Sequence, residues 1–334
     1  MKVLVTGGAG YIGSTTAKAL EDAGHVPIVL DSLLTGPRAF VRDRIFYEGD
    51  VADRELLRRV VADHPDLDCT IHMAARIVVP ESVAEPYAYY RDNVAKSLEL
   101  FDELEALGKP RVVFSSSASL YATVEGFEVT EESPLQPGSP YARTKLMMEQ
   151  VLADIAAAGD LRAVILRYFN PIGSDPDLQS GVYAKEPSHV LGQLTMAALG
   201  QRDAFTITGT DLPTRDGTGI RDYVHVWDLA LAHVAAVEQF DRAIERAESS
   251  STVLNLGTGR GVTVRELLAI FEDVFGRPVP TREAPPRPGD VVGAYANVDR
   301  ARDVLGWSSR LSVADGIESA LAWMNRRRDI LGYA

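Results

Sequence analysis

Short apolar runs alternate with longer amphipathic segments along the first half of the chain. A short apolar run bounded by turn residues predicts a buried strand, and apolar residues spaced three or four apart predict a helix. Strands that alternate with helices predict a parallel, doubly wound sheet of the α/β class. The predicted strands are Val3–Thr6, Val26–Leu30, Ile45–Glu48, Thr70–Met73, Arg111–Ser115 and Leu161–Arg167.

The pattern loosens after Asn170. Residues 171–187 are rich in Gly, Pro, Asp and Ser without a clear period, so we expect a loop region that covers a substrate. Further elements are predicted at His189–Leu199 (helix), Val224–Glu245 (strand and helix), Thr252–Leu256 (strand) and Val264–Phe275 (helix). We therefore expect a Rossmann-type domain, residues 1–170 plus about 218–248, and a smaller, discontinuous α/β C-terminal domain, residues 171–217 plus 249–334.

The first predicted strand runs directly into a glycine-rich loop. Gly7, Gly10 and Gly13 are spaced three apart, and the predicted helix that follows extends to about Gly24. Glycines let the backbone approach a pyrophosphate, which then meets the N–H groups and the positive dipole of the helix start. The next strand ends in Asp31, where an acid binds the adenosine ribose and repels a 2′-phosphate. These features predict a dinucleotide site that prefers NAD to NADP.

Asp50 follows the third predicted strand, in the sequence Gly49-Asp50-Val51. In a dinucleotide site this carboxylate is placed to accept a hydrogen bond from the adenine amino group. Asp is also a preferred helix N-cap, and a helix is predicted at Arg54–Ala62. The sequence leaves both interpretations of Asp50 open.

A serine-bearing strand end and a Tyr–Lys pair are the candidate catalytic groups. Ser115, Ser116 and Ser117 end an apolar run, and Tyr141 and Lys145 stand at i and i+4 on a predicted helix, on one face. A cation about 4 Å from a phenol, at an effective dielectric of about 20, favours the phenolate by roughly 4 kcal/mol, or about three pKa units. Tyr141 would then serve as a general base near neutrality. The alternative is an ordinary amphipathic helix with a half-buried Tyr and a solvated Lys.

Composition limits the remaining possibilities. The 334 residues are 46% hydrophobic, which is enough for two domains and a sizeable core. The net charge of −13, without a basic block, argues against a nucleic-acid or anionic-membrane partner. Since no apolar run approaches about 18 residues, we expect no signal peptide or membrane span and a cytoplasmic protein. Cys69 is expected in a buried strand, and the run from Arg326 to Arg328 on a solvated helix end.

The glycine loop, Asp31, the serine-bearing strand and the Tyr141–Lys145 pair occur together in this order. In these motifs the chain resembles the extended short-chain dehydrogenases/reductases over nearly all of its length. Four further motifs narrow the resemblance to the UDP-glucose 4-epimerases: residues 49–51, 115–118, 167–173 and 216–226. The resemblance implies C4 epimerisation of a UDP-hexose, UDP-glucose or UDP-galactose, by transient hydride transfer through a 4-keto intermediate. It implies NAD as the cofactor and no metal ion.

The resemblance also implies a role for individual residues. Tyr141 would take the proton of the sugar 4-hydroxyl, Ser117 would hydrogen-bond the 4-oxygen, and Lys145 would hold the nicotinamide ribose. The implied cofactor contacts are Gly7, Gly10, Tyr11, Ile12, Gly13, Asp31, Asp50, Val51, Met73, Ala74, Ala75, Arg76, Asn93, Ser115, Tyr141, Lys145 and Tyr168. The implied substrate contacts are Ser117, Tyr141, Asn170, His189, Val190, Arg221, Arg287, Asp290 and Ala294.

Some positions depart from the usual pattern of that family. Ile77 stands where a cofactor-binding lysine is usual, so we expect Arg76 to supply the cation or NAD to be held less tightly. His189 replaces an Asn, and Thr208 replaces an aromatic that stacks on uracil. Ala294 is a small residue at a gatekeeper position. It leaves room for a 2-acetamido group, so UDP-N-acetylglucosamine and UDP-N-acetylgalactosamine are also expected substrates.

Other functions remain open at this stage. Close relatives that eliminate water or decarboxylate usually carry acids where Ala118 and Ser119 stand, so a dehydratase is disfavoured. The alternatives are an epimerase of another nucleotide sugar such as UDP-glucuronate, a nucleotide-sugar reductase, and a non-catalytic NAD-binding regulator. The predicted helical stretch Ser82–Leu107 is more apolar than one sheet face requires. Together with Tyr141–Ala158 it forms the surface of the homodimer that the resemblance implies.

Overall fold

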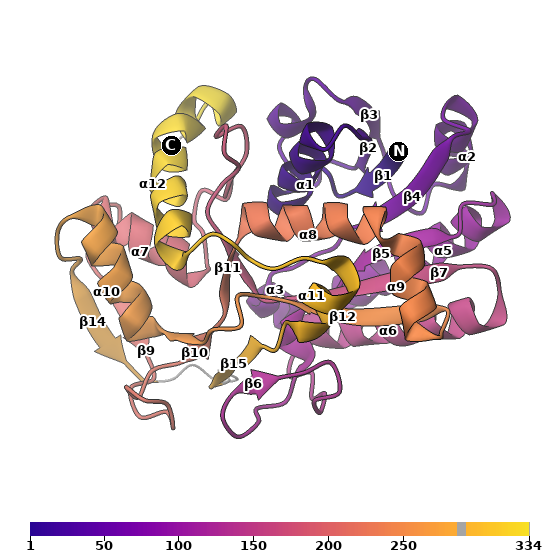
Figure 1. Cartoon of the computed structure of the whole chain (residues 1–334). Helices are drawn as coiled ribbons and strands as arrows, with labels where there is room; N and C mark the ends of the chain where they lie inside the picture. Colours follow the sequence, from indigo (N-terminus) through magenta and orange to yellow (C-terminus); the bar gives the residue numbers. More distant parts are fainter. Residues whose placement is uncertain (286–291, 334) are drawn as a thin grey trace.

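The centre of the fold is a parallel sheet of seven strands (Figure 1). In the computed structural model, which describes residues 1–285 and 292–333, the strand order is β12-β7-β5-β4-β1-β2-β3. Every neighbouring pair is parallel, which confirms the predicted doubly wound sheet. The strands are β1 (Lys2–Thr6), β2 (Val26–Asp31), β3 (Ile45–Glu48), β4 (Leu67–His72), β5 (Arg111–Ser115), β7 (Arg162–Tyr168) and β12 (Ser251–Leu256).

Helices cover both faces of this sheet because its strands are apolar on both sides. On one face, where Val5 and Ile71 are fully buried, α1 and α8 pack side by side, as Figure 1 shows. On the other face, α2, α5 and α6 pack over Leu4 and Phe114. The helices are α1 (Tyr11–Asp22), α2 (Arg54–Asp63), α3 (Val79–Ala84), α4 (Pro86–Tyr90), α5 (Lys96–Ala106), α6 (Pro140–Ala158), α7 (Val190–Ala198), α8 (Val226–Glu238), α9 (Phe240–Ala247), α10 (Val264–Phe275), α11 (Asp299–Leu305) and α12 (Val313–Leu331).

A smaller half, built mostly from segments that follow β7, lies at the left of Figure 1. Here α7, α10 and α12 surround a separate core that includes Leu194, Phe271 and Ile317. Its strands form one four-stranded sheet, β13-β10-β15-β6, and two pairs, β11-β8 and β14-β9. They are β6 (Glu128–Val129), β8 (Asn170–Ile172), β9 (Phe205–Thr208), β10 (Ile220–Arg221), β11 (Tyr223–His225), β13 (Val262–Thr263), β14 (Thr281–Ala284) and β15 (Gly293–Ala296).

One strand does not lie in the domain where the sequence places it. We expect residues 249–334 in the smaller domain, but β12 pairs with β7 and forms the edge of the central sheet. Leu254 and Leu256 on this strand are fully buried in the same core as α8 and α9. The boundary at residue 249 is therefore wrong, because the burial of this strand depends on a partner distant in sequence. The rest of the domain division stays a prediction.

The stretch Ser82–Leu107 is not one continuous α-helix. α3 ends at Ala84, because Pro86 lacks a backbone N–H and disfavours the helical conformation at the preceding residue. After α4, residues Arg91–Ala95 form a π-helical turn that leads into α5. Such turns are frequent at functional sites, and this one contains Asn93.

Two predictions about single side chains have opposite outcomes. Cys69 is buried in β4, as predicted. Arg326 and Arg328 are exposed, but Arg327 between them is only 1% exposed, so the prediction of a solvated helix end is wrong at this residue. Within residues 1–285 and 292–333, no helix has both the length and the apolar character that a membrane crossing requires.

Candidate active site

Gly7 and Gly13 in the glycine-rich loop leave no room for a side chain. Gly7 has φ of 74°, and a Cβ atom there would lie 2.7 Å from the backbone nitrogen of Ala74. A Cβ atom on Gly13 would lie 2.2 Å from the carbonyl oxygen of Gly7. Gly10 forms the N-cap of α1, whose first N–H groups have no partner within the helix. The loop therefore forms a tight backbone cradle at a helix start, which fits a pyrophosphate.

Asp31 ends β2 beside this cradle. Its carboxylate accepts hydrogen bonds from the backbone N–H groups of Ala9 at 3.0 Å and Leu33 at 2.8 Å. Burial raises the pKa of Asp31, and these two hydrogen bonds oppose the rise. The bonds fix the carboxylate at the edge of the glycine loop and leave lone pairs for a ribose diol. The cradle and this acceptor together fit the adenosine diphosphate half of NAD.

Asp50 is not the N-cap of α2. That position belongs to Asp53, which accepts from the backbone N–H of Leu56, so the N-cap interpretation of Asp50 is wrong. Asp50 instead accepts from the backbone N–H of Ala52 and from the ammonium group of Lys96. The adenine contact expected of Asp50 stays a prediction, as does the cofactor contact expected of the adjacent, buried Val51.

The turn after β4 is held by Asn93. Its side-chain oxygen accepts from the backbone N–H of Arg76 at 2.8 Å, and its amide donates to the Arg76 carbonyl at 2.9 Å. This turn contains Met73, Ala74 and Ala75, which the sequence analysis assigns to the cofactor. Asn93 is 3% exposed, so its clearest role in the structure is to shape this turn.

The guanidinium of Arg76 is already paired with carboxylates. Nε donates to Asp92 at 2.7 Å and Nη1 donates to Glu81 at 2.8 Å. These ion pairs do not favour the hypothesis that Arg76 replaces the family lysine toward NAD. Ile77, at the lysine position itself, is 62% exposed.

The catalytic candidates meet at the carboxyl end of β5. Ser139 caps α6, and Pro140 occupies its first turn, as the sequence favours. Tyr141 is 7% exposed and Lys145 is 4% exposed, so the solvated-lysine alternative is wrong. Ser117 lies near enough to Tyr141 to affect its pKa, and Lys145 Nζ donates to the Ser115 carbonyl at 2.7 Å. The structure thus brings both predicted residues of α6 to the serine-bearing strand end.

The predicted fall in the pKa of Tyr141 is not found. Burial raises the pKa of Tyr141, and the interaction with Ser117 only partly opposes this. Lys145 shares the helix face, but its ammonium lies against the Ser115 carbonyl and over the Phe114 ring, at 4.9 Å from the ring centre. Burial also lowers the pKa of Lys145 to about 8, opposed by Glu149. The spacing in the sequence correctly predicted that Tyr141 and Lys145 share one face of α6, but not which group the ammonium of Lys145 binds.

A buried ion pair behind the serines was not predicted. Glu149 and Arg167 form a salt bridge at 2.6 Å, and their side chains are only 6% and 5% exposed. Glu149 also accepts from Ser116, and Arg167 donates to the Tyr121 hydroxyl at 3.0 Å. The signal for this pair was present, since Glu149 follows Tyr141 and Lys145 at the same four-residue spacing.

Tyr168 and Ser115 lie beside a buried histidine. Nδ1 of His233 is 2.8 Å from the Leu229 carbonyl, and Nε2 is 3.1 Å from the Ser115 hydroxyl. The Tyr168 and His233 rings meet edge to face at 6.1 Å. Burial lowers the pKa of His233 to about 4, so this imidazole is neutral at physiological pH. Its Nδ1–H then donates to Leu229, and Nε2 accepts from Ser115.

The predicted substrate residues extend from this site into the smaller half. Asn170 begins β8 with its side chain exposed, and Arg221 Nη1 donates to the carbonyls of Ile220 and Val292. His189 forms the N-cap of α7, where Nδ1 accepts from the Gly192 N–H at 3.2 Å, and Val190 is the first residue of that helix. Arg287 and Asp290 lie outside the described residues.

Ala294 lies next to the arginine of β10. In the parallel pairing of β10 with β15, it stands opposite Arg221. It packs, together with Ala118, against a cluster that contains Tyr121 and Phe169. Since Ala118 follows Ser117 directly, the gatekeeper position lies near the catalytic strand end.

The carboxyl edge of this Rossmann sheet carries a dinucleotide cradle and a Ser–Tyr–Lys group. This combination is typical of nicotinamide-dependent enzymes that act on a hydroxyl or carbonyl group. Comparison with known proteins makes the assignment narrower. The model of the NAD dependent epimerase/dehydratase family matches residues 3–257. The chain belongs to this family.

Individual relatives match over the whole length. A UDP-glucose 4-epimerase of Azospirillum brasilense is 44% identical over 335 residues, covering 100% of this chain and 94% of its own. The crystal structure of the UDP-glucose 4-epimerase from Stenotrophomonas maltophila, with bound NAD and formylated UDP-arabinopyranose, is 36% identical with a TM-score of 0.92. The structure from Bifidobacterium longum, in complex with NAD+ and UDP, is 35% identical with a TM-score of 0.90. Both structures cover 98% of this chain and 99% of their own.

Proposed function

We propose that this enzyme interconverts the C4 epimers of a UDP-hexose, UDP-glucose and UDP-galactose. The observation that carries the proposal is the buried Tyr141, which interacts with Ser117 and lies one helical turn from Lys145, beside a dinucleotide cradle. Relatives that match the whole chain carry the name UDP-glucose 4-epimerase. The positions after Ser117 are Ala118 and Ser119, so elimination has no carboxylate to act as acid or base there.

NAD, when bound, supplies a hydride acceptor that also gives the hydride back. Tyr141 removes the proton of the sugar 4-hydroxyl. After the 4-keto sugar has rotated to present its opposite face, Tyr141 returns the proton to the 4-oxygen. One base is sufficient, because the second half-reaction reverses the first. Ser117 holds the 4-oxygen, and Lys145 binds the nicotinamide ribose. Since Tyr141 acts as a phenolate and burial raises its pKa, the rate should rise with pH.

The same proposal divides the chain between its two ligands. The central sheet, with the glycine loop, Asp31 and the edge strand β12, binds NAD. The smaller half binds the nucleotide sugar through Asn170, Arg221 and the start of α7. An arginine suits a diphosphate because its guanidinium is permanently charged and bidentate.

We also propose a homodimer, for which a patch of exposed apolar side chains gives the physical reason. Val83, Tyr87, Leu98 and Met147, on α3 to α6, are between 37% and 77% exposed. Grouped apolar exposure of this kind marks an interaction surface. Sedimentation analysis should give twice the 36.3 kDa chain mass, and Tyr87→Glu should shift the equilibrium toward the monomer.

The function is tested by incubating the purified protein, with no added cofactor, with UDP-galactose and with UDP-N-acetylgalactosamine in separate reactions. Chromatography resolves the products. Conversion of both supports the epimerase and a roomy pocket at Ala294. Ala294→Tyr should then lose the acetamido substrate and keep UDP-galactose.

Other outcomes discriminate between the alternatives. Conversion of UDP-galactose alone removes the gatekeeper argument. Net consumption of NAD indicates a reductase, and a stable 4-keto product indicates a dehydratase. If neither sugar is converted even with added NAD, the proposal is wrong for these substrates, and UDP-glucuronate is the next to try.

A further inference from the structure

A segment of the smaller half runs between α1 and α12, next to the cofactor cradle (Figure 1). We call residues 173–184 the strap. Three side chains on one side of α1 contact it: the Tyr11 hydroxyl donates to the Gly173 carbonyl at 2.6 Å, Thr15 meets the Ser180 hydroxyl at 3.1 Å, and Lys18 pairs with Asp177 at 2.9 Å. The strap therefore follows the helix whose N-terminus forms the pyrophosphate cradle.

The end of the strap reaches the adenosine side of the site. The Tyr183 hydroxyl donates to Thr35 Oγ1 at 3.4 Å, and its ring meets the Phe40 ring edge to face at 5.9 Å. Thr35 lies in the loop that follows Asp31, the predicted ribose ligand, and Phe40 lies in the short 3-10 helix Arg38–Val41 that comes next. Burial raises the pKa of Tyr183, and the negative charge of Asp31 adds to this rise. The phenol thus lies within electrostatic reach of the Asp31 carboxylate.

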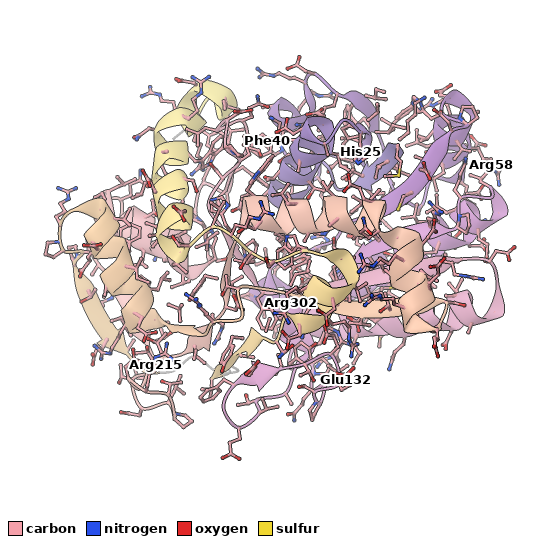
Figure 2. All side chains as sticks on the ribbon, viewed as in Figure 1. His25, Phe40, Arg58, Glu132, Arg215 and Arg302 are labelled. Carbon is pink, nitrogen blue, oxygen red and sulfur yellow. The ribbon has the colours of Figure 1, made fainter. Side chains whose placement is uncertain are left out.

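The C-terminal helix holds the strap from the other side. Trp323 Nε1 donates to the Val182 carbonyl at 2.9 Å, and Arg327 Nη2 donates to the carbonyls of Tyr183 at 3.1 Å and Ala184 at 2.9 Å. Phe40 meets the Trp323 ring at 5.8 Å, and Figure 2 shows Phe40 between α12 and α1. The strap is therefore clamped between the two halves of the molecule.

Arg327 is an unusual anchor. It is 1% exposed, its Nε has no hydrogen-bond partner, and no carboxylate pairs with it in the part of the chain that the structure describes. Burying an unpaired charge destabilises the folded state, so we take the buried guanidinium of Arg327 as a sign that its contacts with the strap are functional. Its two bonds to strap carbonyls and its position over the Tyr333 ring, 5.1 Å from the centre, fix the strap next to Tyr183.

We infer that the strap closes the adenosine half of the NAD site, with Tyr183 covering the ribose that Asp31 binds, so that NAD leaves only when the strap opens. An enzyme that regenerates its cofactor in every turnover has no need to exchange it. Retention then depends on the strap and less on a lysine at position 77. This inference requires only the NAD site, and it holds whichever nucleotide sugar is the substrate.

The test measures the release of NAD from the intact holoenzyme. Enzyme loaded with adenine-labelled NAD is mixed with excess unlabelled NAD, and the retained label is followed by rapid gel filtration. We expect Tyr183→Ala to release NAD at least about tenfold faster, since affinity changes act mostly on the dissociation rate. Lys185→Ala, exposed and just outside the strap, is the matched control and should release NAD at the wild-type rate.

A disulfide that holds the strap closed provides a second test, because it should slow the release of NAD. Thr15 and Ser180 face each other with their hydroxyl oxygens 3.1 Å apart, so Thr15→Cys with Ser180→Cys can form a disulfide across the strap. The oxidised protein should retain label longer than the wild type, and reduction should restore the normal rate. If the folded Tyr183→Ala variant and the oxidised disulfide variant both release NAD at the wild-type rate, the strap does not control the cofactor.

Discussion

Replacing Lys145 with Met should stabilise the folded protein at neutral pH while abolishing its activity. Lys145 is 4% exposed, its ammonium group donates to the Ser115 carbonyl, and no salt bridge to Lys145 occurs among the described residues. Burial lowers its pKa from 10.5 to about 8, against the opposing effect of Glu149. Since one pKa unit corresponds to about 1.36 kcal/mol, the charged form costs the folded state roughly 3 kcal/mol below pH 8.

The sign of the effect depends on pH. Between pH 8 and 10.5 the unfolded chain binds the Lys145 proton and the folded chain does not, so the wild type becomes more stable as pH rises. A methionine of similar length carries no charge, but it gives up the charge-assisted hydrogen bond to the Ser115 carbonyl, worth roughly 2 kcal/mol. We therefore expect a net gain of about 1 kcal/mol at pH 7 that disappears toward pH 10.

Urea unfolding at pH 7 and pH 9.5 measures this difference, after both proteins have been stripped of nucleotide so that bound NAD does not stabilise one of them. Lys96→Met is the control with the opposite sign. Burial lowers the pKa of Lys96, but its bonds to Asp50 and Asp92 outweigh this and raise it, so its charge contributes stability at pH 7. If Lys145→Met is less stable than the wild type by the same amount at both pH values, the buried charge carries no such cost.

Three further substitutions test the site. Tyr141→Phe should lower kcat by about 10²–10⁴-fold in a steady-state assay, because it removes the general base, and a loss below tenfold would contradict its role. Glu149→Gln leaves the Arg167 charge buried without its partner and should cost about 3–5 kcal/mol in urea unfolding, whereas an unchanged midpoint would refute the argument. Gly13→Ala places a Cβ atom 2.2 Å from the Gly7 carbonyl, so the purified variant should contain no NAD by absorbance after extraction.

The central sheet was predictable because its signals are local. Short apolar runs such as Ile45–Glu48 and Arg111–Ser115 match β3 and β5 residue for residue. The glycine loop and the start of α6 were also specified by nearby residues, through close backbone approach and a Ser139 cap. Elements that pair across long sequence distances, such as β12 with β7, carry no local sign of the sheet they join.

The positions of charged side-chain ends were less predictable. Lys145 was expected to stabilise the Tyr141 phenolate, but its ammonium binds a carbonyl that lies 30 residues earlier in the chain. Arg327 was expected in solvent, yet it is buried against the strap. A long flexible side chain can reach several partners from one backbone position, so sequence spacing fixes its face and not its target.

One helix face explains how the catalytic group is held. Tyr141, Lys145 and Glu149 occupy successive turns of α6, and each meets one of the three consecutive serines at the end of β5: Ser117, Ser115 and Ser116, respectively. The buried cation and the buried acid are tolerable there because each has a hydrogen-bond partner, and the buried base lies beside the Ser117 hydroxyl. Moving α6 relative to β5 would break all three contacts together. The chemistry at Tyr141 therefore depends on the packing of one helix against one strand end.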